Sequence, residues 1–298
     1  LQLFASEGSE GKWLETPFGA QPIRLLKPRK IPELDFAFLA VEASIAKRWA
    51  FRLARRGAIV IDKSSYFRDK PHIPLVTPEV NGEILFNYRG IIANPNCTVI
   101  PAVMALAPLH RLFGLKRFTA VSFQSVSGSG KEGLRALEHE LEDENVQAAC
   151  FPHRIAFNVI PWIGGRGRDG SSGEEIKMIQ ESRRILALPR LSAQTTSVRV
   201  PTRVGHAAAI HAEFRRAVDL ERAREAWAGF PGLVVIDEPD KGEYPMPITA
   251  AGKDEVQVGR LRRVRGRCGI AFWVVTDNLR KGAATNAVQI AETVIKYS

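Results

Sequence analysis

Along the first third of the chain, apolar runs that are typical of strands alternate with a pattern that is typical of a helix. Continuous apolar runs, which are typical of buried strands, lie at residues 36–41 and 58–62. Between them, residues 44–56 predict a helix with basic residues on one side. Strands and helices in alternation predict a parallel sheet, and the ligands of such sheets bind at the carboxyl ends of the strands. We therefore expect a binding edge at residues 62–65 and 94–97.

The pattern changes from about residue 117 onward. The strand-like segments become longer, and some are spaced for antiparallel pairing, among them residues 118–125, 194–201 and 207–215. One helix is predicted at 174–186, with Ser171 and Ser172 available as caps. A long amphipathic stretch at 282–296 predicts a last helix. This part of the chain therefore favours a second domain of the α+β class.

Length and hydrophobic content set the broad class of the protein. A chain of 298 residues with 45% hydrophobic residues can bury one large core or two ordinary ones. No uninterrupted apolar stretch approaches the length of a membrane span, and no signal-peptide pattern opens the chain. We therefore expect a globular protein with no membrane partner.

The number of cysteines and the net charge indicate the cellular compartment and the classes of binding partner. Cys97, Cys150 and Cys268 are too few and too scattered for a disulfide framework or a zinc cluster, so we expect no metal site and a reducing, cytoplasmic setting. The formal net charge is +10, and much of it lies in local runs such as residues 260–267. No aromatic residues are interleaved there, which favours a solvated basic surface over nucleic-acid binding. An anionic small substrate is equally compatible with this charge.

Cys97 is the first candidate for chemistry. It lies in Asn94-Pro95-Asn96-Cys97-Thr98, between an apolar strand-like run and the apolar run 99–113. Asn-Pro-Asn favours a turn, and backbone N–H groups at the start of a helix favour a reactive thiolate. A buried structural cysteine is the competing interpretation. The turn favours a nucleophile.

Several other side chains suit chemistry beside a nucleophile. His206 suits proton transfer, and Arg199 carries a planar group that suits a carboxylate. Arg68 and Lys177 are cations that could hold a phosphate, and Gln124 precedes a turn of small residues. Each of them alone is equally compatible with an ordinary surface or core position, and the spacing of Lys177 from Glu174 also suits a helix-surface ion pair.

Several segments in a fixed order resemble the aspartate-semialdehyde dehydrogenases. They are residues 94–98, 124–128, 155–161, 174–178 and 277–287. The likeness covers most of the chain from about residue 58 to residue 292, and the bacterial branch of the family fits best.

The resemblance implies a reaction and its two catalytic residues. The reaction is the NADPH-dependent reduction of L-aspartyl 4-phosphate to L-aspartate 4-semialdehyde and phosphate, in the biosynthesis of lysine (through diaminopimelate), threonine, methionine and isoleucine. By similarity, Cys97 attacks the acyl phosphate and forms a thioester, and His206 is the acid/base. Covalent capture divides one difficult displacement into two easier steps.

The resemblance also assigns the substrate contacts. Arg199 would hold the α-carboxylate, Glu174 the amino group, and Gln124 the acyl group. The phosphate would be held by Arg68, Lys177 and Asn96. A substrate with two anionic groups needs several cations that are held apart, so that one pose is productive.

The match is weaker on the cofactor side. The family opens with a strand and a Gly-rich turn that cradles the pyrophosphate, whereas this sequence opens with the strand-like residues 1–5 and has no such turn. Lys63 also replaces an asparagine that is usual in the family. The positions that match cofactor-binding residues are Ser6, Ser9, Ser44, Ser127, Gly128, Asn278, Lys281 and Gly282.

These departures leave alternatives open. The chain is either an enzyme cut or processed at its start, or a divergent homologue that has lost cofactor binding and acts as a scaffold or binding protein. A third alternative is an enzyme like N-acetyl-glutamyl-phosphate reductase. The spacings from Glu174 to Lys177 and from Arg199 to His206 fit the aspartate enzyme better.

The resemblance implies a fold and an assembly. We expect a Rossmann-type dinucleotide-binding domain at residues 1–96, N-terminally incomplete, to which a helix at 277–298 returns. An α+β substrate and dimerisation domain like that of glyceraldehyde-3-phosphate dehydrogenase is expected at 97–276. We also expect a homodimer or homotetramer.

Overall fold

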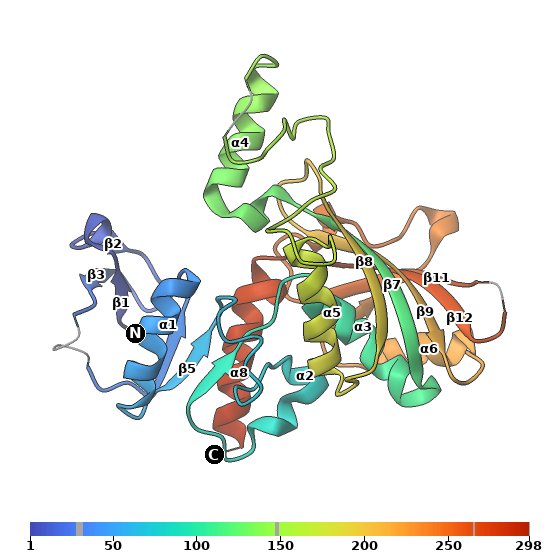
Figure 1. The fold of residues 1–298 in the computed structure, drawn as a ribbon, viewed down its shortest axis with the longest axis horizontal. Coiled ribbons are helices and arrows are strands. Elements are labelled where there is room, and N and C mark those ends of the chain that lie inside the picture. Colours follow the sequence, from blue (N-terminus) through green and yellow to red (C-terminus); the bar gives the residue numbers. More distant parts are fainter. Residues whose placement is uncertain (28–31, 147–148, 265, 298) are drawn as a thin grey trace.

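Two small sheets form the N-terminal part of the molecule, at the left of Figure 1. In the first, β3 (Gln21–Leu25) lies between β1 (Leu3–Ala5), to which it is parallel, and β2 (Trp13–Leu14), to which it is antiparallel. The second is wholly parallel, in the order β4 (Phe36–Leu39), β5 (Ile59–Asp62) and β6 (Ile91–Ala93). The strands predicted at 36–41 and 58–62 are therefore confirmed as β4 and β5, with the parallel pairing that was expected.

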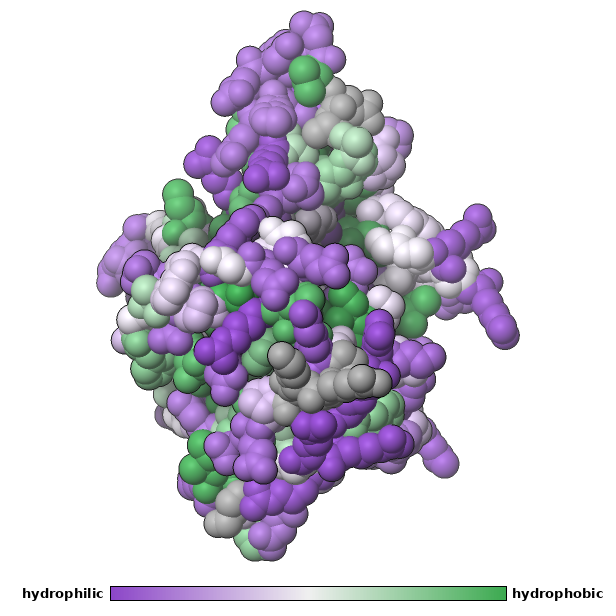
Figure 2. All heavy atoms as spheres, turned by 90° about the vertical axis from the view of Figure 1, so that its left-hand side faces the viewer, coloured by the Kyte–Doolittle hydropathy of each residue, from purple (hydrophilic) through white to green (hydrophobic). Residues whose placement is uncertain are grey.

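The computed structural model describes residues 1–27, 32–146, 149–264 and 266–297. Arg265, within the basic run, and Ser298 lie outside the described residues. Within these ranges no helix is both long enough and apolar enough to cross a membrane. Figure 2 shows the side of the molecule that carries the first sheet, where hydrophilic residues surround separate hydrophobic patches.

Helices cover both faces of the second sheet because successive side chains of β5 point to opposite faces. Val60 packs on one side with Ala46, Ala50 and Leu53 of α1 (Ala43–Ala54). Ile59 and Ile61 pack on the other side with apolar residues of α8 (Thr285–Lys296), namely Ala287, Ile290, Ala291 and Val294. The last helix of the chain therefore lies against the first domain, while the predicted boundary at residue 96 stays a prediction.

A larger mixed sheet forms the second part of the molecule. Its order is β10-β11-β12-β9-β7-β8. The strands are β7 (Leu115–Gln124), β8 (Ser192–Arg199), β9 (His206–Phe214), β10 (Leu233–Val235), β11 (Val256–Arg263) and β12 (Gly269–Thr276). The α/β first part and α+β second part that were expected from the sequence are both present.

One predicted pairing is wrong. The segment at 194–201 was expected among strands spaced for antiparallel pairing, but β8 runs parallel to β7, while β9 is antiparallel to β7. A crossover connection that contains α4 (Gly130–Glu142) and α5 (Gly173–Ile185) joins β7 to β8, as a parallel pair requires. This parallel pairing places the carboxyl ends of β7 and β8 at the same edge.

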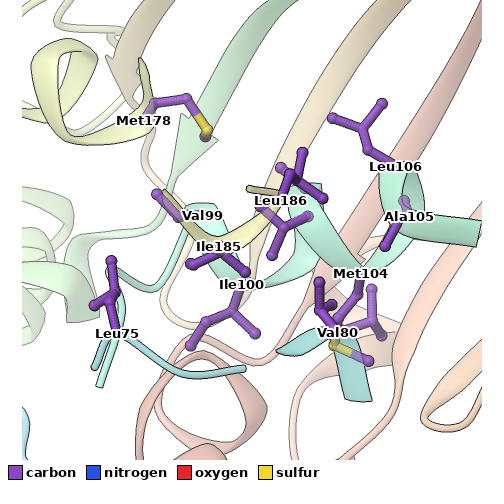
Figure 3. Packing of buried hydrophobic residues seen from close by; sticks show 14 of the residues in the cluster. Leu75, Val80, Val99, Ile100, Met104, Ala105, Leu106, Met178, Ile185 and Leu186 are labelled. Atoms are coloured by element: carbon purple, nitrogen blue, oxygen red, sulfur yellow. The ribbon is translucent and has the colours of Figure 1, made fainter. Parts of the chain in front are cut away.

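Helices α3 (Val99–Phe113), α5 and α6 (Leu220–Ala228) cover one face of the large sheet. Figure 3 shows how Val99, Ile100 and Met104 of α3 pack with Met178 and Ile185 of α5. Helix α5 begins at a capping box in which Ser172 and Glu175 satisfy each other's backbone N–H groups. These contacts fix the start of α3 against the first turns of α5.

The remaining elements are short. They include α2 (Pro78–Asn81), α7 (Pro247–Ala250) and a π-helical turn (Arg280–Ala284) that leads directly into α8. Among the described residues, 3-10 turns lie at Glu7–Ser9, Gly82–Leu85, Val126–Ser129 and Pro239–Lys241. Helix α4 projects from the body of the molecule, at the top of Figure 1.

Candidate active site

The ends of several strands meet around one pocket of about 380 Å³. Strands β6, β7, β8 and β12 reach it with their carboxyl ends, and β9 begins beside it. Cys97 and all the predicted substrate residues line this pocket: Arg68, Asn96, Gln124, Glu174, Lys177 and Arg199. Residues that are far apart in the sequence thus share one cavity.

Asn96 builds the turn that presents Cys97. Its Oδ1 accepts hydrogen bonds from the Thr98 backbone N–H at 2.9 Å and from the Thr98 hydroxyl at 2.6 Å. Its carbonyl oxygen accepts from the backbone N–H groups of Val99 and Ile100, at the start of α3. Cys97 therefore lies in a fixed turn directly before a helix, as the sequence predicts.

The electrostatics of Cys97 differ from what the turn alone suggests. Burial raises the pKa of the Cys97 thiol to about 12, with a further contribution from the negative charge of Glu174. Arg68, Arg199 and Lys177 act in the opposite direction but do not outweigh these effects. The thiol is therefore protonated near pH 7 in the empty pocket.

Helix α5 supplies a carboxylate and a cation that face Asn96. The Lys177 ammonium lies 2.6 Å from Glu174 Oε1, and Asn96 Nδ2 donates to Glu174 Oε2 at 2.8 Å. Burial opposes ionisation of Glu174, but Lys177, Asn96 and Arg68 outweigh it and hold the pKa of this carboxyl below its usual value. Glu174 therefore offers a negative charge to the pocket.

Glu181, one of the residues that the sequence reasoning missed, lies behind these groups. Its Oε2 accepts from the Asn96 backbone N–H at 2.7 Å, and its Oε1 lies 3.5 Å from Arg68 Nη1. The side chain is almost fully buried, and burial raises the pKa of the carboxyl against the pull of Arg68. The signal was present in the sequence, because Glu174 and Glu181 are seven residues apart and so share one face of α5.

The parallel register of β7 and β8 places Gln124 beside Arg199. Arg199 Nη1 donates to the Ser125 carbonyl oxygen at 2.7 Å, and the guanidinium lies over the Phe151 ring, 5.7 Å from its centroid. Gln124 Nε2 donates to Glu174 Oε2 at 3.5 Å. Arg199 is buried and held from two sides, with its remaining N–H groups available to a carboxylate.

His206 is buried behind Gly128, which lines the pocket. The Ser125 backbone N–H donates to His206 Nδ1 at 3.1 Å, which assigns the ring proton of the neutral imidazole to Nε2. Nε2 has no hydrogen-bond partner among the described residues, and a Cβ atom at Gly128 would lie 3.2 Å from it. Burial, with a contribution from Arg199, lowers the pKa of His206 to about 3, so the ring is neutral near pH 7.

The candidate cofactor residues fall into two groups. Ser127, Gly128, Asn278 and Gly282 line the Cys97 pocket. Ser6 and Ser9 flank the first 3-10 turn and Ser44 lies in the first turn of α1, so these three do not line it. The cofactor role of every one of these residues stays a prediction.

Lys281 lies next to the pocket but its side chain is fully buried. Its ammonium donates to both oxygens of Glu79 at 2.8 Å and to Gln289 Oε1 at 2.5 Å. The charge of Lys281 is therefore neutralised inside the protein, which leaves the backbone of this position for any contact with a cofactor.

Two glycines that line the pocket are closely packed. A Cβ atom at Gly282 would lie 3.2 Å from Cys97 Cβ, and one at Gly128 would lie 2.6 Å from Arg199 Nη1. A side chain at either position would therefore displace Cys97 or Arg199.

Two family descriptions match the chain. Residues 1–88 match "Semialdehyde dehydrogenase, NAD binding domain", and residues 106–281 match "Semialdehyde dehydrogenase, dimerisation domain".

Curated and solved proteins agree with these matches. Aspartate-semialdehyde dehydrogenase of Aquifex aeolicus is 43% identical, over 99% of this chain and 90% of that protein. The enzyme of Bacillus subtilis is 37% identical, over 100% of this chain and 90% of that protein. The solved structure of aspartate semialdehyde dehydrogenase II complexed with ASA from Vibrio cholerae superposes with a TM-score of 0.93, at 37% identity, over 99% of this chain and 89% of that one.

Proposed function

The chain belongs to the aspartate-semialdehyde dehydrogenase family, and we propose that it reduces L-aspartyl 4-phosphate to L-aspartate 4-semialdehyde and phosphate through a thioester on Cys97. One observation carries the proposal. A single pocket holds a thiol beside the cations Arg68, Lys177 and Arg199 and the carboxylate of Glu174. A substrate with a phosphate, a carboxylate and an ammonium group matches this set of charges.

The first step forms the thioester. Cys97 Sγ attacks the acyl carbon, the bond from this carbon to the phosphate oxygen breaks, and the thiol proton leaves with the phosphate. Arg68 and Lys177 stabilise the departing charge, while Asn96 and Gln124 orient the two ends of the acyl phosphate. Because the resting thiol is protonated, its deprotonation accompanies attack on bound substrate.

His206 contributes an N–H group at Nε2. In the resting protein this nitrogen carries the proton and lies behind Gly128, so it can donate a hydrogen bond to the acyl oxygen as negative charge develops there. After reduction of the thioester, the tetrahedral adduct collapses to the aldehyde, and the Cys97 thiolate takes up a proton from solvent. The neutral ring of His206 thus acts first as a hydrogen-bond donor, and the ring keeps its proton.

The cofactor that we propose is NADPH. A bound reduced nicotinamide supplies hydride to the thioester carbonyl carbon. Gly128, Gly282 and Asn278 line the pocket that holds Cys97, which supports the fit at this end. The carboxyl ends of β4 and β5 are where the rest of a dinucleotide would lie.

A homodimer is part of the proposal. The face of the large sheet that α3, α5 and α6 leave open carries half-buried apolar side chains, including Val121 and the Phe123–Trp273 pair, whose ring centroids are 5.4 Å apart. We infer that a second copy of the chain covers this face, and we expect a cytoplasmic enzyme.

The test is phosphate-dependent reduction of NADP⁺ with L-aspartate 4-semialdehyde. We expect turnover with this substrate, less with N-acetyl-L-glutamate 5-semialdehyde, and none in Cys97→Ala. Cofactor specificity is read from the same assay with NAD⁺. If unmodified protein with a free Cys97 thiol gives no turnover in the presence of phosphate and either cofactor, the proposed function is wrong.

A further inference from the structure

Lys63 is a cation of the pocket that the proposed reaction does not use. It directly follows β5, and its backbone N–H donates to the Leu39 carbonyl oxygen at 3.0 Å, which places it between the carboxyl ends of β4 and β5. Its side chain is half-buried and lines the same cavity as Cys97. Its carbonyl oxygen accepts from Arg68 Nη2 at 2.8 Å, so the two cations come from one rigid loop.

The other cations of this pocket have partners within the protein. Arg68 faces Glu181 at 3.5 Å, and Lys177 contacts Glu174 at 2.6 Å. Arg199 donates to a backbone carbonyl oxygen. The side chain of Lys63, in contrast, makes no hydrogen bond or ion pair within the part of the chain that the structure describes.

An ammonium group that is partly withdrawn from water without a counter-charge is unfavourable. Burial alone lowers the pKa of Lys63, which agrees with an ammonium group that lacks a counter-charge. A ligand that brings negative charge to this wall of the pocket would remove the penalty. Both molecules of the proposed reaction carry phosphate, and the carboxyl edge of a parallel sheet is where such groups bind.

We propose that the Lys63 ammonium binds a phosphate group at the edge of the Cys97 pocket, brought either by the acyl phosphate or by the dinucleotide. The inference rests on the proposed function only for the identity of these two carriers. Lys63 is then a specificity-determining residue that adds a cation to those of Arg68 and Lys177, where an asparagine would add a neutral amide.

The experiment measures binding without turnover. Inorganic phosphate is titrated against the rate at which iodoacetamide alkylates Cys97, and NADPH is titrated by the change in its fluorescence, both at constant ionic strength. Lys63→Asn removes the charge and Lys63→Arg keeps it. Lys241→Asn makes the same charge change at an exposed lysine, 3.5 Å from Glu238 and outside the pocket.

In Lys63→Asn we expect a dissociation constant about 10-fold higher for one of the two ligands, because one charge-assisted hydrogen bond is lost. Weaker phosphate protection would assign Lys63 to the substrate, and weaker NADPH binding would assign it to the cofactor. Lys63→Arg should stay within about threefold of the parent, and Lys241→Asn should not differ from it. Circular dichroism checks that the variants are folded, and Lys63→Gln serves if Lys63→Asn is not.

The proposal is overturned if Lys63→Asn binds phosphate and NADPH as tightly as the parent, or if the parent binds neither ligand. A protein that binds phosphate through Lys63 but shows no turnover would instead contradict the proposed function and leave this inference intact.

Discussion

At the scale of single residues, burial keeps the two proposed catalytic groups neutral. Burial raises the pKa of Cys97 and lowers that of His206, so neither carries a charge near pH 7. Burial disfavours the charged form of each of these two groups because it removes water from around the charge. In the proposed reaction, charge would form next to the arginine and lysine side chains that line the pocket.

Gly128 tests how closely the site is packed. A Cβ atom there would lie 2.6 Å from Arg199 Nη1, so Gly128→Ala displaces the guanidinium from the Ser125 carbonyl oxygen. We expect the KM for the semialdehyde to rise about 10-fold or more, with a smaller change in kcat, since a charge-assisted contact is disturbed. Gly165→Ala is the control, because nothing lies within 4 Å of an added Cβ there. Equal KM values for both variants would contradict the proposed role of Arg199 in substrate binding.

His206 also predicts a dependence of stability on pH. The unfolded chain takes up a proton at this residue below pH 6.5, whereas the folded protein resists protonation until about pH 3. The unfolded state thus binds more protons between these values, and acid favours unfolding by about 1.5 kcal/mol between pH 6.5 and pH 5. Denaturant unfolding of the parent and of His206→Gln at both pH values measures this. Parallel losses in the two proteins would contradict the prediction.

At the scale of elements, α5 organises the side of the pocket that is proposed to hold phosphate. Glu174, Lys177 and Glu181 lie on one face of the helix: Glu174 contacts Asn96 and Lys177, and Glu181 contacts Asn96 and Arg68. The capping box at Ser172 fixes the first turn of α5. It therefore also fixes the positions of the three side chains relative to the turn before α3. The geometry around Cys97 therefore depends on a helix whose own residues do no chemistry at the sulfur.

Glu181→Gln tests this dependence. The substitution leaves the half-buried Arg68 without its carboxylate, and a hydrogen bond to a charged group contributes about 1.5–3 kcal/mol. We expect a clear loss of unfolding free energy together with a phosphate KM at least several-fold higher, because the Arg68 guanidinium then keeps, among the described residues, only its contact with the Lys63 carbonyl oxygen. Glu225→Gln, at an exposed position of α6, should change neither quantity. A destabilised variant with an unchanged phosphate KM would make Glu181 structural only.

The sequence predicted most of this arrangement because motifs record side-chain chemistry well. Cys97, Arg199, Glu174 and Lys177 were all found, and they line one pocket. Glu181 was missed because its importance comes from burial and from contacts with Asn96 and Arg68, which its spacing from Glu174 alone does not show. Lys63 was noted only as a departure from the family, because its place in the pocket is visible only in the fold. The predicted direction of β8 relative to β7 was wrong for a similar reason. The sequence of a strand does not show its orientation, which becomes clear only when the crossover between the two strands is traced.

At the scale of the whole molecule, the open face of the large sheet predicts the assembly. Ala209 lies on this face, half-buried, between Val121 of β7 and Trp273 of β12. Ala209→Arg would place a charge at the centre of a dimer interface, so we expect light scattering to report half the parent mass. Ala228→Arg, at an exposed position of α6 on the other side of the sheet, should leave the mass unchanged. A full-mass Ala209→Arg protein would place the interface elsewhere.

The return of α8 to the second sheet has a consequence for the nascent chain. Asn286 donates to the Val76 carbonyl oxygen at 3.0 Å, across 210 positions of sequence, and Ile290 packs with Ile59 and Ile61. At bacterial or eukaryotic translation rates, roughly 10–40 s pass between the synthesis of these two segments. During this interval one face of the second sheet lacks its covering helix, and a chaperone that binds apolar strands has time to engage it. The second domain can fold first, which reverses the order in which the two domains are made.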